Sequence, residues 1–441
     1  MSSDASRYPR SGLEIGFIRL RVLWLKTELL HPVDKGGKIR TYNMLKELKR
    51  DHHVTYLTLD DGSASAEDCQ NASEYCHELV CIPHARREKF TAGFYFELLL
   101  NLISPQPYAI KKYESSAMLR EIVDREQNGS FDLLVCDFLA PATNVPGSLS
   151  IPAVLFQHNV EAMIWKRHYE VQSNPLKKIY LYGQWRKMWR FEKAMCRRFD
   201  RVIAVSADDR EQMKNEYGAG AVFDVPTGVD TEFFRPSGRI QPSAHNLVFT
   251  GSMDWLPNDD AIRYFMREIM PLIKKGVPDV TLTVVGRNPP AALIDLSKDD
   301  SSLIITGRVD DVRPYIESAA AYVVPLRIGG GTRLKIFEAM AMERAVVSTT
   351  IGAEGLSLTD GVELLLADEP AAFADRVVRV LTDASYANDL GQRAASIVRK
   401  NYGWRQVTDR FVSICKSRAL SQLDESEVQS SSFSLPDKST A

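Results

Sequence analysis

The sequence predicts an α/β protein with two doubly wound parallel-sheet domains that face each other across a cleft. Near its start, a strand, a loop, a helix and a second strand follow one another, and such βαβ units imply a parallel sheet. The same alternation restarts after Phe234-Arg235-Pro236. A chain of 441 residues is long enough for two or three domains.

The first domain begins with the apolar run Leu20–Leu25, which predicts a buried strand. The apolar spacing of Ile39–Lys49 is helical, whereas His53–Leu59 alternates as a strand does. Further strands are predicted at Leu79–Ile82, Leu133–Cys136, Ala153–Phe156 and Val202–Val205.

The second domain follows a segment from Phe234 to Ser243 that carries two prolines and a Ser-Gly pair, as linkers do. Helical spacing in Asp260–Ile273 predicts a helix, and further helices are expected from Ala371 and Leu390. Strands are predicted at Leu247–Thr250, Val280–Val285, Leu303–Thr306, Ala321–Val324, Ala345–Ser348 and Glu363–Leu366.

These patterns divide the chain into six expected parts. They are a flexible N-terminus at 1–19, a first domain at 20–235, a linker at 236–245, a second domain at 246–402, a helix at 403–418 that packs back on the first domain, and a tail at 419–441. The tail is rich in serine and acidic residues, a composition that predicts disorder.

The composition is that of an ordinary globular protein, with 25% charged and 44% apolar residues. A formal net charge of -2 gives no sign of nucleic-acid binding. The polar start and the six cysteines predict a protein of the reducing cytoplasm. We expect no metal, because the spacings of Cys69, Cys76, Cys81 and His84 do not match paired Cys-x2-Cys ligands.

The stretch Gly329–Ala341, GGGTRLKIFEAMA, places three glycines and two cations directly before a predicted helix. Glycines let a ligand approach the backbone, and free amides at a helix start favour an anion. Two cations in a first helical turn oppose the helix dipole unless an anion compensates them. The pattern therefore predicts a phosphate site that uses Arg333 and Lys335.

From about Leu20 to Ala419 the chain resembles the glycosyltransferases of family 4, which have the GT-B architecture of two Rossmann-like domains. The motifs that carry the resemblance are VDKGGKIRTYNMLKEL at Val33–Leu48, QHNVE at Gln157–Glu161, VIAVSADD at Val202–Asp209, PTGVDTEFF at Pro226–Phe234, FTGSMDWLPNDDAI at Phe249–Ile262 and GGGTRLKIFEAMAMERAVVST at Gly329–Thr349. The resemblance implies sugar transfer with retention from a nucleotide donor such as a UDP- or GDP-sugar, without metal or cofactor. It also implies a glycan, lipid-linked or other small acceptor, and a role in bacterial polysaccharide or glycoconjugate biosynthesis.

The resemblance also assigns site residues. Arg333, Lys335 and His158 are expected to be catalytic, with both cations facing the diphosphate. The Glu338 carboxylate is expected to hold the donor ribose. The other expected donor contacts are Gly36, Gly37, Gly251, Gly286, Arg287, Arg308, Val309, Gly330, Gly331 and Thr332, and the expected acceptor-side residues are Lys38, Asn159 and Glu161.

The chain departs from the family pattern at two points. Glycine stands at Gly330, where relatives carry the first of two glutamates, and GSMDWLPNDD lacks the Arg and Lys that many members carry there. A pseudo-transferase that binds nucleotide sugar without transferring it, and a sugar-nucleotide epimerase, are the alternatives. A Rossmann oxidoreductase is disfavoured because no strand is followed by Gly-x-Gly-x-x-Gly.

Two segments bear on the acceptor side. Leu176–Arg198 combines aromatic residues with many Lys and Arg residues, which fits either a helix at an anionic membrane surface or a solvated basic face. Phe90–Ile103 is apolar but too short to span a membrane, and it contains Glu97 and Asn101. Peripheral contact with the inner face of the membrane therefore stays open beside a purely cytoplasmic location.

Overall fold

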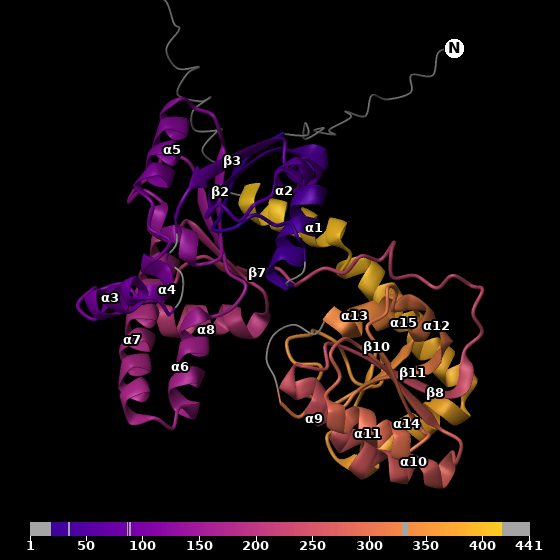
Figure 1. Cartoon of the computed structure of the whole chain (residues 1–441). Coiled ribbons are helices and arrows are strands. Elements are labelled where there is room, and N and C mark those ends of the chain that lie inside the picture. The colour runs from indigo at the N-terminus through magenta and orange to yellow at the C-terminus, as the bar shows by residue number, and fades with distance from the viewer. Residues whose placement is uncertain (1–18, 34–35, 86, 88–89, 329–333, 417–441) are drawn as a thin grey trace, which may run out of the picture.

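The structure is a computed structural model of the whole chain, and it describes residues 19–33, 36–85, 87, 90–328 and 334–416 (Figure 1). It contains two parallel β-sheets, each flanked by helices, which confirms the predicted α/β class. The first half of the chain builds one sheet and the second half builds the other.

The N-terminal sheet has seven strands in the order β3-β2-β1-β4-β5-β6-β7, and all neighbouring strands are parallel. The strands are β1 (Arg21–Lys26), β2 (His53–Asp60), β3 (Glu78–Pro83), β4 (Leu133–Asp137), β5 (Ala153–Phe156), β6 (Arg201–Ala204) and β7 (Val222–Asp224). Strand β7 has only three residues and was not predicted, because a run this short carries no periodic signal.

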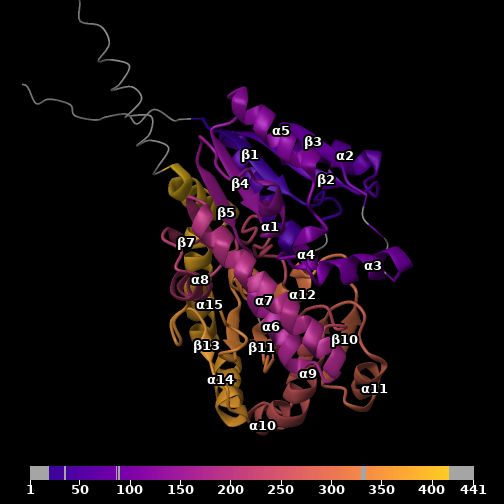
Figure 2. The ribbon, with the colours of Figure 1, turned by 90° about the vertical axis from the view of Figure 1, so that its left-hand side faces the viewer.

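The helices of the N-terminal unit alternate with these strands along the chain and lie around the sheet (Figure 2). None of the described helices is long and apolar enough to cross a membrane. The helices are α1 (Gly36–Asp51), α2 (Ala66–Asn71), η1 (Ala72–Glu74), α3 (Ala92–Asn101), α4 (Tyr108–Lys111), α5 (Ser116–Gln127), η2 (Ala140–Asn144), α6 (Glu161–Val171), α7 (Pro175–Arg198) and α8 (Ala207–Tyr217).

The C-terminal sheet has six parallel strands in the order β10-β9-β8-β11-β12-β13. The strands are β8 (Ser243–Thr250), β9 (Thr281–Val285), β10 (Leu303–Gly307), β11 (Ala319–Val324), β12 (Ala345–Ser348) and β13 (Leu365–Leu366). The helices are α9 (Leu256–Tyr264), η3 (Phe265–Ile269), α10 (Met270–Gly276), α11 (Ala291–Asp299), α12 (Arg313–Ser318), α13 (Leu334–Ala341), α14 (Pro370–Thr382) and α15 (Ala384–Asn401).

The single helix predicted over Asp260–Ile273 is interrupted by a π-helical turn at Phe265–Ile269. Proline at position 271 explains the interruption, because it has no N–H to donate to the preceding turn and its ring needs extra space there. The two α-helical parts continue on either side of this turn, so the prediction was right about the helix and wrong about its regularity.

The strand order reverses between β1 and β4 in the first sheet and between β8 and β11 in the second. Ligands of doubly wound sheets bind beyond the carboxyl ends of the strands at such a reversal. Helices α1 and α13 begin after β1 and β11, so their N-termini lie at these two places.

After α15, a last helix at 404–416 returns to the N-terminal unit, where the yellow ribbon lies against it in Figure 1. Its side chains Trp404, Val407 and Phe411 belong to the same buried cluster as Trp24 and Phe156. The Phe411 and Trp24 rings lie 5.6 Å apart. The end of the chain therefore packs on the unit in which the chain begins.

Candidate active site

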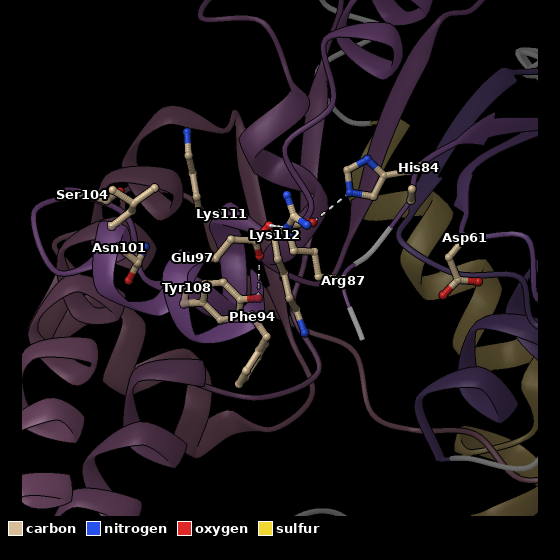
Figure 3. A pocket seen from close by; sticks show the side chains of 12 residues that line it. Asp61, His84, Arg87, Phe94, Glu97, Asn101, Ser104, Tyr108, Lys111 and Lys112 are labelled. Atoms are coloured by element: carbon tan, nitrogen blue, oxygen red, sulfur yellow. Dashed lines mark hydrogen bonds and ion pairs between the residues drawn. The ribbon is translucent and has the colours of Figure 1, made fainter. Parts of the chain in front are cut away.

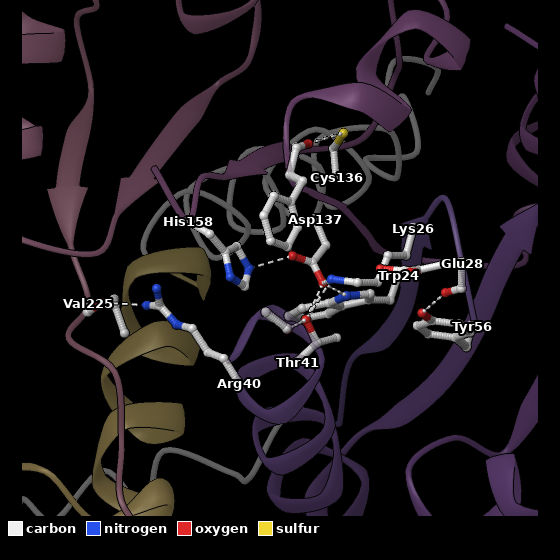
Figure 4. A network of polar contacts seen from close by, with 12 residues as sticks. Trp24, Lys26, Glu28, Arg40, Thr41, Tyr56, Cys136, Asp137, His158 and Val225 are labelled. Atoms are coloured by element: carbon white, nitrogen blue, oxygen red, sulfur yellow. Dashed lines mark hydrogen bonds and ion pairs between the residues drawn. The ribbon is translucent and has the colours of Figure 1, made fainter. Parts of the chain in front are cut away.

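Asp137 is the centre of a buried polar network at the carboxyl ends of β1, β4 and β5 (Figure 4). One oxygen, Oδ2, accepts hydrogen bonds from Lys26 Nζ at 2.8 Å and Thr41 Oγ1 at 2.6 Å. The same oxygen accepts a third from Trp24 Nε1 at 3.0 Å. The other oxygen, Oδ1, lies 2.6 Å from Nε2 of His158. Both oxygens of this carboxylate thus have partners within the protein.

These partners keep Asp137 ionised. Burial by itself would raise the pKa of this carboxyl group, but attraction to Lys26 and His158, and hydrogen bonds from both, hold its pKa well below the ordinary range. An ionised carboxylate only accepts hydrogen bonds, so the proton of the short contact belongs to Nε2 of His158.

A lowered pKa leaves His158 neutral near pH 7, and the contact with Asp137 then places its single proton on Nε2. Burial lowers its pKa to about 4, and Asp137 opposes this shift without reversing it. A neutral ring that donates from Nε2 has an acceptor at Nδ1. Such a nitrogen can accept a hydrogen bond from a sugar hydroxyl.

Phe138 covers His158 with its ring. The two ring centroids lie 3.8 Å apart and the planes differ by 14°. Phe138 has a φ of 72°, which is unusual for a bulky residue and costs about 1–3 kcal/mol. A side chain at Gly37 would place its Cβ 2.7 Å from Phe138 Cζ. Glycine at position 37 therefore makes room for this ring.

Gly36 and Gly37 lie in the first turn of α1 rather than in a loop before it. First-turn amides have no helical acceptor, so they are available to an anion even inside the helix. The expected contact of these two residues with the donor therefore stays a prediction.

Arg40 is a second buried cation near His158. One of its nitrogens donates to the Val225 carbonyl at 2.5 Å, and its guanidinium lies 4.5 Å from the centre of the Phe156 ring. Burial lowers its pKa to about 9, against the attraction of Asp137. Its Nε and one further nitrogen have no hydrogen-bond partner among the described residues.

The facing site in the C-terminal unit is built around Lys335, in the first turn of α13. Lys335 Nζ donates to Asn258 Oδ1 at 3.0 Å and lies 4.1 Å from the centre of the Phe249 ring. Asn258 in turn donates to the Ser252 carbonyl at 2.8 Å. The ammonium group therefore has a fixed position at the end of β8.

Gly251 and Gly286 are glycines because of close contacts within the protein. A Cβ at Gly286 would lie 1.7 Å from the Gly251 carbonyl oxygen. A Cβ at Gly251 would lie 2.8 Å from Lys335 Nζ and 2.7 Å from Asn258 Nδ2. These two glycines thus let Lys335 reach the carboxyl ends of the strands.

Glu338 follows Lys335 by one turn of α13 and is partly buried. Burial raises the pKa of its carboxyl group to about 7, and Lys335 opposes the shift. Within the part of the chain that the structure describes, no donor hydrogen-bonds to this carboxylate. The carboxylate is thus available to a ligand hydroxyl.

The remaining donor-side residues lie around the same strand ends. Arg287 Nε donates to Ser252 Oγ at 2.9 Å, whereas Arg308 is exposed. Val309 packs against the apolar cluster beneath β11. The expected contacts Gly330, Gly331, Thr332 and Arg333 lie outside the described residues.

Of the three acceptor-side residues, Lys38 is buried and its Nζ lies 3.5 Å from the Pro32 carbonyl oxygen. Burial raises the pKa of Glu161 to about 6. Asn159 lines a cavity of about 140 Å³ together with Ser206 of the N-terminal unit and Glu354 and Gly355 of the C-terminal unit. The two units therefore meet beside the predicted acceptor loop.

No group of three or more His, Cys, Asp or Glu residues within the described ranges is arranged to hold a metal ion. Cys76 donates to the Ala72 carbonyl at 3.1 Å, and His84 donates from Nε2 to the Lys112 carbonyl at 2.8 Å. These side chains already have partners within the protein.

Sequence reasoning missed Asp137, Lys26 and Arg40. A local signal was present for two of them, since Lys26 and Asp137 are charged residues that end the apolar runs LRVLWL and LLVC. Two opposite charges at adjacent parallel strand ends predict a contact, because those ends meet at one sheet edge. Arg40 gave no such signal.

Two family models match most of the chain. Glycosyltransferase Family 4 matches residues 35–233, and Glycosyl transferases group 1 matches residues 244–383. The chain is a family 4-like glycosyltransferase. Its two facing parallel sheets form the GT-B fold, as the resemblance predicted.

The chain is also similar to individual proteins. An uncharacterized 44.6 kDa protein in the cps region of Klebsiella pneumoniae is 23% identical over 410 residues, which cover 90% of this chain and 99% of the relative. A phosphatidyl-myo-inositol mannosyltransferase of Mycobacterium tuberculosis is 27% identical over 229 residues, or 49% of this chain and 59% of the relative. The structure of Anabaena HepE in complex with UDP has a TM-score of 0.58 at 13% identity and covers 90% of this chain and 100% of HepE.

Proposed function

We propose that this glycosyltransferase moves a sugar, with retention at the anomeric carbon and without a metal, from a nucleotide-sugar donor to a glycan or lipid-linked acceptor. The reaction would serve the biosynthesis of a bacterial polysaccharide or glycoconjugate. The observation that carries the proposal is the fixed ammonium of Lys335 at the N-terminus of α13, one turn before the partly buried Glu338. The complex of the structural neighbour HepE with UDP supports a nucleotide donor.

The proposed reaction uses these positions as follows. The bond between the anomeric carbon and the donor phosphate breaks, and a bond from that carbon to the acceptor oxygen forms on the same face. The acceptor proton passes to the departing phosphate oxygen. Negative charge grows on the diphosphate, and a preorganised cation such as Lys335, together with the amides of α13, stabilises it.

The other two groups orient the donor. Glu338, when ionised, accepts hydrogen bonds from ribose hydroxyls. His158 accepts a hydrogen bond at Nδ1 from a hydroxyl of the reacting sugar, because Asp137 fixes its proton on Nε2. Asp137 is thus a positioning residue that acts through His158.

A cytoplasmic location fits this reaction and forms part of the proposal. All six cysteines are free thiols, which is the state that a reducing compartment maintains.

A thermal-shift panel of UDP, GDP, ADP and their common sugar conjugates tests the donor site. A ligand that binds only the native state raises the melting temperature once its concentration exceeds its dissociation constant. We expect one nucleotide to shift the wild type and to shift Lys335→Ala much less. Lys298→Ala, on the exposed surface of α11, is the matched control and should respond as the wild type does.

Turnover of the sugar conjugate found in the panel completes the test. Lys335→Ala should lower kcat by about two to three orders of magnitude, the scale of losing one transition-state donor. The same loss is expected for Arg333→Ala. Wild-type turnover in Lys335→Ala would contradict the role of this lysine.

The glycine at position 330 favours one second candidate, a pseudo-transferase that binds nucleotide sugar without transferring it. Slow hydrolysis of the donor by the wild type separates the two candidates, since a pseudo-transferase would bind the nucleotide and release no sugar.

A further inference from the structure

Helix α3 is an inverted amphipathic helix. Its only buried residue is the polar Asn101, whereas most of its large apolar side chains face solvent. The exposed fractions reach 56% for Tyr95, 59% for Phe96 and 62% for Leu99. Leu102 and Ile103, which follow the helix, are 53% and 89% exposed. Such a contiguous apolar surface marks a contact with another apolar body.

Polar contacts hold α3 in place. Gln184 Nε2 donates to Asn101 Oδ1 at 2.9 Å, and Lys187 Nζ donates to the Asn101 carbonyl at 2.6 Å. The Glu97 carboxylate accepts from Arg87 Nε at 2.6 Å and from Tyr108 OH at 3.0 Å. The helix is therefore fixed through its polar residues while its apolar face stays outside the core.

A cavity of about 640 Å³ lies under α3 (Figure 3). Phe94 and Leu100 of α3 line one side, and His84, Lys111 and Lys112 are among the polar residues of the lining. Because His84 follows β3, the cavity lies at the carboxyl-end edge of the same sheet that carries Asp137. Its size suits a polar head group of moderate volume.

The lining of the cavity carries three cations, Arg87, Lys111 and Lys112, and two carboxylates, Asp61 and Glu97, so its formal charge is +1. Glu97 is already paired with Arg87, so it does not neutralise the two lysines. Lys112 Nζ lies 4.7 Å from the centre of the Tyr113 ring, and no carboxylate of the described residues lies within ion-pair distance of it. Among the described residues, Lys111 forms an ion pair with Glu114 at the surface. An exposed pair of this kind exchanges readily with another anion.

We propose that the apolar face of α3 and the cavity beneath it dock the chain on a membrane leaflet that carries anionic phospholipid. The exposed side chains of α3 enter the boundary of the hydrocarbon layer, and the cavity with Lys111 and Lys112 receives a phosphate head group. The combination favours a bilayer over a protein partner, since apolar residues flanked by lysines are the pattern of interfacial helices.

Helix α7 contacts α3 through Gln184 and Lys187. Its burial bears on whether this basic helix lies at a membrane surface or has a solvated basic face. Its C-terminal part packs in the domain, where Trp185 and Trp189 contact the N-terminal core. Its first turns are exposed instead, with Leu176 at 79% and Ile179 at 70%. The basic helix is thus a domain helix with one exposed end.

Sedimentation with vesicles tests the docking surface, using the full chain without any nucleotide. We expect the wild type to bind vesicles of equal parts phosphatidylcholine and phosphatidylglycerol. Phe96→Ser/Leu99→Ser should weaken binding by about tenfold to one hundredfold, because two large apolar side chains no longer enter the bilayer. The matched control is Ile304→Ser/Val362→Ser, which replaces side chains of similar exposure, 45% and 42%, on the C-terminal unit and should bind normally.

A second arm tests the head-group cavity. Lys111→Gln/Lys112→Gln should weaken binding to the anionic vesicles by about fivefold for each lysine removed, and high salt should do the same. If the wild type bound vesicles of pure phosphatidylcholine equally well, the proposal that the cavity selects an anionic phospholipid would be wrong. Unchanged melting temperatures show that all variants fold.

Two results would overturn the membrane as the occupant. One is a wild type that binds neither kind of vesicle. The other is a wild-type dimer in solution that Phe96→Ser/Leu99→Ser converts to a monomer, which would make α3 an interface between two copies. Since no donor is present in these assays, they succeed or fail independently of sugar transfer.

Discussion

The two sides of the candidate active site differ in how their buried carboxylates are compensated. On the N-terminal side, Asp137 has a protein partner for each oxygen, and its pKa lies well below the ordinary range. On the C-terminal side, burial raises the pKa of Glu338 to about 7, and no described residue donates a hydrogen bond to it. One carboxylate is already satisfied by the fold, whereas the other is available to a ligand.

This difference separates two kinds of buried charge. A buried charge that the fold compensates holds neighbouring groups in position, and its removal lowers the free energy of unfolding because its partner is left uncompensated. A charge that the fold leaves uncompensated costs stability and is explained by function. We therefore expect changes around Asp137 to act mainly on folding and on the orientation of His158, and changes around Glu338 to act mainly on donor binding.

The largest effect should come from Asp137→Ala. Removing this carboxylate leaves Lys26 as an uncompensated buried cation, so the free energy of unfolding should fall by about 3–5 kcal/mol. Urea denaturation of the full chain measures this change. Asp295→Ala removes an exposed ion pair with Lys298 and should cost less than about 1 kcal/mol. Equal losses of unfolding free energy in the two variants would show that the buried Asp137 network stabilises the fold no more than an exposed ion pair does.

A smaller effect is expected from Gly286→Ala on the C-terminal side. The added Cβ would lie 1.7 Å from a backbone oxygen of Gly251, so the strand ends must move apart, at a cost of about 1–3 kcal/mol. The shift should also displace Lys335 and weaken nucleotide binding.

Gly183→Ala is the matched control for this glycine, because a Cβ at position 183, within helix α7, meets nothing within 4 Å. Its melting temperature should equal or exceed that of the wild type, since alanine favours helix. If Gly286→Ala keeps both the melting temperature and the nucleotide affinity of the control, close packing at the strand ends is not what selects glycine.

The smallest effects are two pH dependences of opposite sign. The pKa of His158 in the folded chain is about 4, below its ordinary value of about 6.5. The stability of the wild type relative to His158→Gln should thus be complete above pH 6.5 and fall as the pH drops towards 4. The pKa of Glu338 is raised to about 7, so the wild type relative to Glu338→Gln should lose stability as the pH rises from about 4.5 to 7.

Urea denaturation at a series of pH values measures both differences. The wild type minus each variant isolates the titration of one group from the rest of the chain. The two differences in unfolding free energy should change with pH in opposite directions. If both changed in the same direction, the contrast between the Asp137 side and the Glu338 side would be wrong.

The sequence by itself determined the fold class and most of the elements. The strands predicted at Ala153–Phe156 and Ala345–Ser348 have the same bounds in the structure, because a short apolar run between polar turns is a local signal. The family motifs led to Lys335, Glu338 and His158 for the same reason, since each lies in a contiguous segment.

Only the tertiary structure decided which groups meet. Asp137 finds Lys26 at a distance of 111 residues along the chain, and Asn101 finds Gln184 at a distance of 83. Periodicity reports burial within one element and carries no information on the partner across the fold. The burial of Asn101, the buried polar residue of α3, is therefore explained by a distant hydrogen-bond partner, which no local pattern records.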